Sequence, residues 1–148
     1  MVNIASLSTT VGFALAAVVA GAEPVIGRDD LWGCVEVRQD AGELHFRFQQ
    51  AQGPNGPFVP SRSSYLSVQG PTGSPIFWLI QAPDETTVEE IIYGVVPKEF
   101  EQIIPRIGQP PRLVPDRKYG VSARTPDIAI ATFKYGEPGV VGCPRVPG

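Results

Sequence analysis

The chain carries few of the side chains that enzymatic catalysis usually needs. Its single histidine, His45, stands between Leu44 and Phe46 in a run that alternates apolar and polar residues. A catalytic triad needs a histidine base that is oriented by an acid and placed against a nucleophile. The alternation puts His45 on the polar face of a strand without Ser or Asp beside it. We therefore expect a solvent-facing histidine that has no catalytic role.

Sites for metals, nucleotides and cofactors also lack their usual residues. One His and two Cys are too few for a zinc site. The pairs Asp29-Asp30 and Asp84-Glu85 do not have the spacing of a calcium loop. The sequence contains no phosphate loop, dinucleotide fingerprint or Gly-x-Ser-x-Gly motif. We predict that the protein uses no cofactor and no metal.

Carboxylate chemistry is harder to exclude, because two acidic residues from distant strands can cleave a glycosidic bond without leaving a motif. The nearest cluster of candidates is Glu89, Glu90, Glu99 and Glu101. In a strand, neighbours such as Glu89 and Glu90 point to opposite faces, so a solvated sheet surface explains them better. A small carboxylate-dependent hydrolase stays open as an alternative.

Length and charge limit the remaining functions. A chain of 148 residues suits one domain with a single core, and 43% hydrophobic residues can fill that core. The formal net charge is -3, with both signs dispersed along the chain. Such a balance offers no basic footprint for nucleic acid. A mildly basic segment is diluted by acidic residues, and we interpret it as a solvated face, with an anion site as the alternative: Arg106, Arg112, Arg117, Lys118 and Arg124.

The N-terminal segment has the character of a secretory signal. Residues 1–22 contain no Asp, Glu, Lys or Arg and end in Ala20-Gly21-Ala22. The apolar run from Val11 to Ala20 has the length of a signal h-region and is short for a bilayer span of ~20 residues. We expect a cleaved signal peptide (1–22), one mature domain (23–148) and export to the periplasm, the cell surface or the medium. An uncleaved anchor and a buried core segment remain alternatives, since no Lys or Arg lies near Met1.

The two cysteines, Cys34 and Cys143, favour a disulfide, because an exported protein with two cysteines usually pairs them. The alternative is a lipoprotein, since Leu31 to Cys34 reads "LWGC" and loosely matches a lipid-acceptor box. The charged residues before this box argue against it. Contact with a membrane is therefore expected only if the N-terminus is retained or Cys34 is lipidated.

Short strands are expected along the rest of the chain. The segment from Cys34 to Gln50 alternates strictly and predicts a hairpin with a three-residue turn at Asp40-Ala41-Gly42. Its core face would carry Val35, Val37, Leu44, Phe46 and Phe48. Further strands are expected at 65–70, 76–82, 99–105, 118–123 and 128–136, the second of them apolar on both faces.

Residues 86–96 are ambiguous between strand and helix. Thr86 with Glu89 imitates a helical capping box. We favour a strand, because β-branched residues dominate and Gly94 follows soon after. Seven to nine short strands with no convincing helix predict an all-β, immunoglobulin-like antiparallel β-sandwich.

The run from Ile91 to Val121 carries a recognisable pattern: Tyr-Gly, then Pro-x-x-Phe-x-Gln, a Pro, a "PP-x-L" segment and a closing Tyr. It resembles small exported bacterial proteins of uncharacterised function. The resemblance implies a β-sandwich and no activity. Where those proteins commonly have Gly, this chain has Glu99.

These observations favour a non-catalytic exported binding module, or a subunit of an envelope or surface assembly, with an unknown protein or surface partner. Loops and an open sheet edge would make the contact, above all the long irregular stretch from Gln49 to Ser64. Phe58 is its candidate apolar anchor and Arg62 its polar companion. Phe58 could instead cover the edge of the core. A membrane-tethered accessory subunit is a further alternative.

Overall fold

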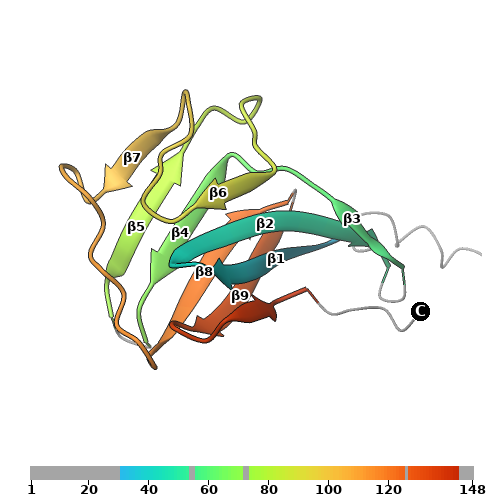
Figure 1. The fold of residues 1–148 in the computed structure, drawn as a ribbon. Helices are drawn as coiled ribbons and strands as arrows, with labels where there is room; N and C mark the ends of the chain where they lie inside the picture. The colour runs from blue at the N-terminus through green and yellow to red at the C-terminus, as the bar shows by residue number, and fades with distance from the viewer. Residues whose placement is uncertain (1–30, 54–55, 72–73, 126, 144–148) are drawn as a thin grey trace, which may run out of the picture. The chain divides into compact units, whose positions relative to one another are not determined.

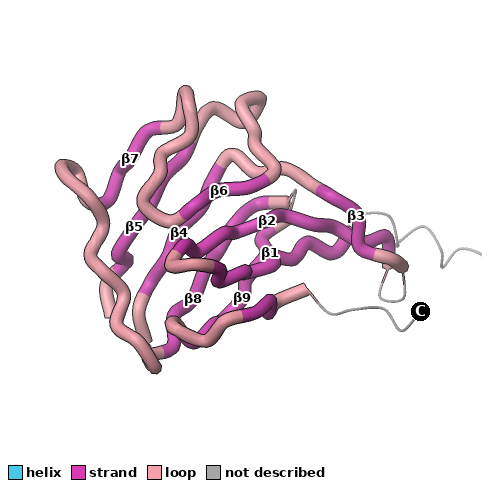
Figure 2. The backbone as a smooth tube through the Cα atoms, in the orientation of Figure 1, coloured by secondary structure: helices cyan, strands magenta, loops and turns pink. Residues whose placement is uncertain are grey.

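Ten strands in two antiparallel sheets make up the part of the protein that the computed structural model describes, which is residues 31–53, 56–71, 74–125 and 127–143. The predicted signal peptide and its possible cleavage site lie outside these residues. Figure 2 shows strands and loops throughout the described part, and Figure 1 shows the two layers of strands. The prediction of an all-β sandwich is confirmed, while the immunoglobulin-like order of strands stays a prediction.

The first sheet has the order β10-β1-β2-β3, with β6 also paired to β2. Its strands are β1 (Leu31–Asp40), β2 (Glu43–Gln52), β3 (Phe58–Pro60), β6 (Glu90–Ile92) and β10 (Gly139–Val141). The second sheet has the order β7-β5-β4-β8-β9. Its strands are β4 (Tyr65–Gln69), β5 (Ile76–Gln81), β7 (Glu101–Ile104), β8 (Lys118–Arg124) and β9 (Ile128–Lys134). Ten strands exceed the predicted seven to nine because β3, β6 and β10 have only three residues each.

The β1–β2 hairpin confirms the predicted alternation. All five residues of its predicted core face are buried: Val35, Val37, Leu44, Phe46 and Phe48. Its turn is shorter than predicted, since Asp40 pairs with Glu43 and leaves only Ala41 and Gly42 between the strands. Both turn residues have positive φ, at 49° and 85°. A two-residue turn of this kind has a backbone twist that matches the right-handed twist of the flanking strands, which favours it over the longer loop.

Aromatic rings join the two sheets. Phe46 of the first sheet meets Phe133 of the second edge-to-face, with ring centroids 6.0 Å apart, and Phe133 stacks on Tyr119 at 5.9 Å. Around them lies one apolar cluster that includes Trp78, the largest fully buried side chain. In β9 two of the three core positions are small, since Ala129 and Ala131 are buried on the same face as Phe133.

The segment that carries the Tyr-Gly and Phe-x-Gln pattern has a structural role. Of the strand predicted over residues 86–96, only β6 (Glu90–Ile92) forms, and no helix forms there. Trp78 Nε1 donates a hydrogen bond of 2.8 Å to Gln102 Oε1. The Gln102 amide in turn donates to the carbonyls of Pro105 and Gly108, at 2.9 and 2.8 Å. Gln102 therefore ties the core tryptophan to the bend that follows β7.

The long irregular stretch from Gln49 to Ser64 is more regular than its composition suggests. Strand β2 continues to Gln52, and β3 then pairs back onto it. Pro60 is the last residue of this short edge strand. A missing backbone N–H is tolerated on an edge strand. The predicted loop is therefore mostly a hairpin at the edge of the first sheet. Among the described residues, no helix is long and apolar enough to cross a membrane.

Candidate binding surfaces

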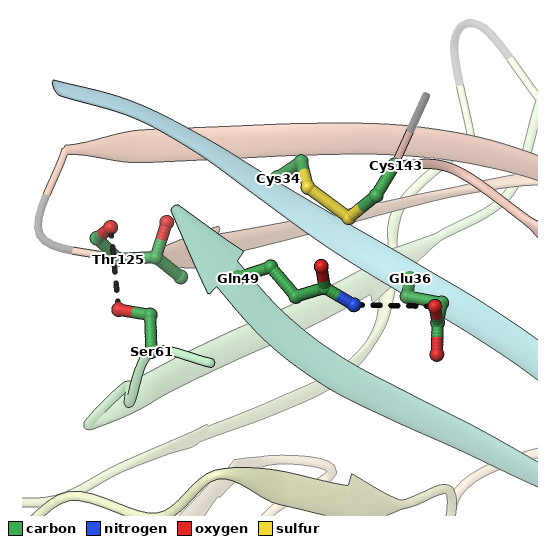
Figure 3. The surroundings of a disulfide bond; sticks show 6 residues. All are labelled: Cys34, Glu36, Gln49, Ser61, Thr125 and Cys143. Carbon is green, nitrogen blue, oxygen red and sulfur yellow. Dashed lines mark hydrogen bonds between the residues drawn. A yellow bond between two sulfur atoms is a disulfide. The ribbon is translucent and has the colours of Figure 1, made fainter. Parts of the chain in front are cut away.

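The predicted disulfide between Cys34 and Cys143 is confirmed, with Cα atoms 5.4 Å apart. It joins β1 to the residues that follow β10, as Figure 3 shows. Gly142 lies so close to β1 that a Cβ atom there would collide with the carbonyl oxygen of Val35. Beside the disulfide, the amide of Gln49 donates a hydrogen bond of 3.2 Å to Glu36 Oε2. Gly142 and Cys143 are therefore held tightly against the first strand.

An aromatic row lies on the outer face of the first sheet, across β1, β2 and β3. Trp32 is paired with Ala51, and Ala51 is paired with Phe58. Paired residues in antiparallel strands share a face, and Trp32 has the parity opposite to Val35 and Val37, which face the core. We call Trp32, Ala51 and Phe58 the aromatic platform. Trp32 is 50% exposed.

Ala51 shows how the aromatic platform is packed. It is only 2% exposed, yet it does not belong to the hydrophobic core cluster. Its cross-strand neighbours on that face are Trp32 on one side and Phe58 on the other. Phe58 is half-buried and belongs neither to the core cluster nor to the side chains that pack against that cluster. The structure thus favours an outward-facing Phe58 over one that covers the core edge, and its binding role stays a prediction.

Trp32 was not among the candidate residues from the sequence, although the sequence does indicate that its side chain faces outward. Continuing the hairpin alternation backward from Val35 places Gly33 inward and Trp32 outward. The apolar row becomes visible only once the pairing of β2 with β3 is known. That pairing depends on the connection between Gly53 and Phe58. Amino-acid composition alone does not determine the geometry of this connection.

Arg62, the predicted polar companion of Phe58, is exposed, and its guanidinium group is bonded to other residues of the chain. Its Nε donates to Thr87 Oγ1 at 2.9 Å, and one terminal nitrogen donates to the Thr87 carbonyl at 2.7 Å. The other terminal nitrogen pairs with Glu89 Oε2 at 3.1 Å. Arg62 therefore fastens the loop between β5 and β6. It also borders a cavity of about 360 Å³ together with Ser64, Asp84, Thr87 and Arg124.

His45 is more enclosed than its alternation predicted. Its side chain is 20% exposed and lies between two carboxylates. Nδ1 is 3.1 Å from Glu90 Oε2, and Nε2 is 3.2 Å from Glu43 Oε1. Both contacts are hydrogen bonds only when both ring nitrogens carry protons. With both nitrogens facing carboxylates, neither is placed to take a proton from a nucleophile.

The four glutamates considered for hydrolysis do not gather in a cleft. Glu89 pairs with Arg62, Glu90 contacts His45, Glu99 lies in a turn and Glu101 lies in β7. A different pair, Asp40 and Glu43, borders a cavity of about 340 Å³ at the β1–β2 turn. Both are exposed. A carboxyl group acts as an acid near neutral pH mainly where it is shielded from water.

A neighbouring cavity of about 710 Å³ lies between the β1–β2 turn and the Pro-rich connection. Tyr93 lines it and donates a hydrogen bond of 2.7 Å to the carbonyl of Pro111. Its ring also meets Trp78 edge-to-face, with centroids 5.2 Å apart. Burial, with smaller contributions from Tyr119 and Tyr135, raises the pKa of Tyr93 well above its usual value of 10.0. Within the described ranges no group of three or more His, Cys, Asp or Glu side chains is arranged to hold a metal ion.

Comparisons with known proteins leave the family open. No family model, no curated protein and no solved structure matches the chain. The function is therefore inferred from the arrangement of the chain's own side chains.

Proposed function

We propose that the protein is an exported, non-catalytic binding module, or a subunit of an envelope or surface assembly, that holds its partner through the aromatic platform. The main support for this proposal is the row of Trp32, Ala51 and Phe58 on the outer face of the first sheet, outside the core. The partner is an unidentified protein or surface component with an apolar face.

Physical chemistry supports this use of the aromatic platform. Aromatic side chains bury a large area and have only two side-chain torsions to fix, so they give much interface energy for little lost entropy. Trp and Tyr, with Arg, dominate the residues that contribute most to protein interfaces. A sheet is a rigid base, and the disulfide at Cys34 anchors β1 two residues from Trp32. The aromatic platform is therefore organised before the partner arrives.

The binding test compares Trp32→Ala and Phe58→Ala with Val59→Ala. Val59 is a matched control, because it is 47% exposed and alternates with Phe58 in β3. The two platform variants should keep their free energy of unfolding within about 1 kcal/mol and lose capture of partners from an envelope extract. Val59→Ala should keep both. A large loss of stability in Phe58→Ala with unchanged capture would show that Phe58 supports the fold.

Tryptophan fluorescence gives a second readout of the same test. The chain has two tryptophans, and Trp78 is fully buried while Trp32 is half-exposed. Acrylamide in solution should therefore quench mainly Trp32. A captured partner should protect Trp32 from quenching, and unchanged quenching in the complex would place the contact elsewhere.

Export is a separate part of the proposal. It is supported by the uncharged apolar segment at 1–22 and by the Cys34–Cys143 disulfide. Because Cys34 is bonded to Cys143, its sulfur is occupied and does not carry a lipid in this state. Intact-mass measurement of the natural protein should give a chain that begins near Glu23. Retention of Met1 would support the membrane-tethered accessory subunit, and acyl chains on Cys34 would support the lipoprotein.

Hydrolysis is the second candidate, favoured only by the position of Asp40 and Glu43 at one cavity. These residues are paired across the β1–β2 turn. Glycosidase activity that disappears in both Asp40→Asn and Glu43→Gln, with stability unchanged, would establish it over the binding module.

A further inference from the structure

Strand β9 is the last strand of the second sheet and pairs only with β8 among the strands of the described residues. The N–H of Tyr135, just after β9, donates to the Arg117 carbonyl at 2.9 Å. In this register the odd-numbered residues of β9 direct their backbone N–H and C=O groups toward β8. Even-numbered residues therefore direct their backbone groups away from β8. The amide of Gln39 caps one of them by donating to the Lys134 carbonyl at 2.8 Å. Among the described residues, the backbone groups of Ile128, Ile130 and Thr132 have no strand partner on this side, so they form an open edge.

This open edge is apolar. Ile128 is 68% exposed and Ile130 is 70% exposed, which is unusual for two isoleucines on one strand. Next to them is a hollow of about 530 Å³ whose lining includes Gly120, Ser122, Ile130 and Thr132. Gly120 has no side chain to fill this place. Natural proteins usually protect such an edge with a charge, a proline or a bulge, and the centre of β9 has none.

Basic residues lie near both ends of the edge, and one acidic residue, Asp127, precedes β9. Lys118 and Lys134 are directly opposite each other in the β8–β9 register. Like charges in this position repel each other. Neither lysine forms a salt bridge in the part of the chain that the structure describes, and Lys118 also lines the hollow. At the other end, Arg124 lies over the Tyr65 ring at 5.0 Å and likewise has no acidic partner among the described residues.

We propose that β9 accepts an extended acidic segment of a partner protein as an added strand. The partner's backbone would complete the open edge, its apolar side chains would pack on Ile128 and Ile130, and its carboxylates would lie near Lys118 and Lys134. A second copy of this chain fits the charges less well, because the start of its β9 would bring one carboxylate, that of Asp127, to the two lysines Lys118 and Lys134. The proposal is independent of the aromatic platform, which lies on the other sheet.

Synthetic peptides of about the length of β9 test the proposal with the full mature chain. The first peptide alternates valine and threonine and carries glutamates at both ends. The second has lysines in place of the glutamates, and the third is the acidic peptide with alternate backbone amides methylated. The acidic peptide should bind at least about tenfold more tightly than the basic peptide, as measured by fluorescence anisotropy. It should also shift the amide NMR signals of Ile130 and Thr132.

Protein variants locate the site. Ile130→Lys should abolish binding of the acidic peptide, and Ile107→Lys should not, since Ile107 is 88% exposed in a loop outside β9. The double variant Lys118→Glu with Lys134→Glu should reverse the preference toward the basic peptide.

Four results would overturn the proposal. Equal binding of the methylated peptide would exclude strand addition. Equal binding of the acidic and basic peptides would remove the role of the lysines. Self-association in sedimentation that Ile130→Lys abolishes, with no peptide bound, would assign the edge to a second copy. Failure of all three peptides to bind would also count against it.

Discussion

Glu99 has a backbone conformation that residues other than glycine usually avoid, with φ at 71°. Glu99 is exposed and makes no salt bridge in the described part of the chain. Glu99→Gly should therefore raise the free energy of unfolding by up to about 1 kcal/mol, because it removes the strain of the left-handed region.

Urea unfolding measures this effect, and Lys98→Gly is the matched control. Lys98 is the neighbouring residue and does not have a positive φ. Glycine there should only add freedom to the unfolded chain and should lower stability. A loss of stability in Glu99→Gly as large as that in Lys98→Gly would contradict the prediction.

The raised pKa of Tyr93 predicts how the free energy of unfolding responds to alkaline pH. Its pKa is raised by burial above the usual 10.0, so the folded protein keeps this proton at a pH where the unfolded chain loses it. Stability is therefore unaffected by this group below about pH 10 and falls as pH rises further. Tyr93→Phe should weaken this alkaline loss. It should also lower stability by about 1 kcal/mol at neutral pH, because the hydrogen bond to Pro111 is lost.

Unfolding curves recorded from neutral pH to about pH 11 check this prediction. Tyr65→Phe provides the comparison, since Tyr65 is half-buried in β4 and its hydroxyl has no hydrogen bond among those described. Its alkaline loss should resemble that of the unaltered protein. The same slope in Tyr93→Phe as in Tyr65→Phe would mean that another group causes the loss.

At the scale of elements, β10 depends on its covalent attachment. It has three residues, all exposed, and pairs with β1 at only three positions. The disulfide closes a separation of 109 residues. Reducing it should lower the free energy of unfolding by roughly 2 to 5 kcal/mol, because the unfolded chain gains freedom.

Hydrogen exchange and urea unfolding follow the change. Reduction should speed exchange of the amides that join β10 to β1 more than those that join β1 to β2. The variant Cys34→Ala with Cys143→Ala should reproduce both effects without a reductant. Equal stability of oxidised and reduced protein would contradict the prediction.

How much of each element could be predicted depends on whether the information was local. The β1–β2 hairpin was predicted because its strands are adjacent and its apolar residues alternate over both. The pairing of β6 with β2, between Ile91 and Phe46, could not be predicted, since nothing near either residue specifies the other. The hairpin with β3 was hidden by Gly and Pro, which are typical of a loop.

The candidate site was likewise predictable only where the information lay within a short stretch of sequence or left one choice. The Cys34–Cys143 bond was predictable because the chain offers one pairing only. Phe58 was identified as an aromatic in irregular sequence, but its neighbour Trp32 is brought to it by the register of two hairpins. The opposition of Lys118 and Lys134 likewise depends on the register of β8 and β9. Such registers are set by turns, and the amino-acid composition of a turn does not determine its geometry.

At the scale of the whole sandwich, the two sheets meet closely where Gly33 of β1 faces Thr125, which follows β8. A Cβ atom on Gly33 would collide with the Thr125 hydroxyl. Thr125 is fully buried, and its Oγ1 is the buried side-chain oxygen that lacks a hydrogen-bond partner among the described residues. Figure 3 shows Thr125 beside Ser61, whose hydroxyl donates to the Thr125 carbonyl at 3.5 Å. We therefore expect the close approach of Gly33 to Thr125 to set the distance between the layers at this end.

A double-mutant cycle tests that role. Gly33→Ala should lower the free energy of unfolding by about 1 to 3 kcal/mol through overpacking. In a Thr125→Ala background the same substitution should cost less by about 1 kcal/mol or more, because the colliding hydroxyl is gone. Thr125→Val is the matched control: it removes the unpaired hydroxyl and should raise stability by about 1 kcal/mol, yet it keeps the bulk that opposes a methyl group at position 33. If the effects of Gly33→Ala and Thr125→Ala simply add, the two residues do not set the spacing, and the sheets are held apart by the aromatic contacts around Phe46 and Phe133.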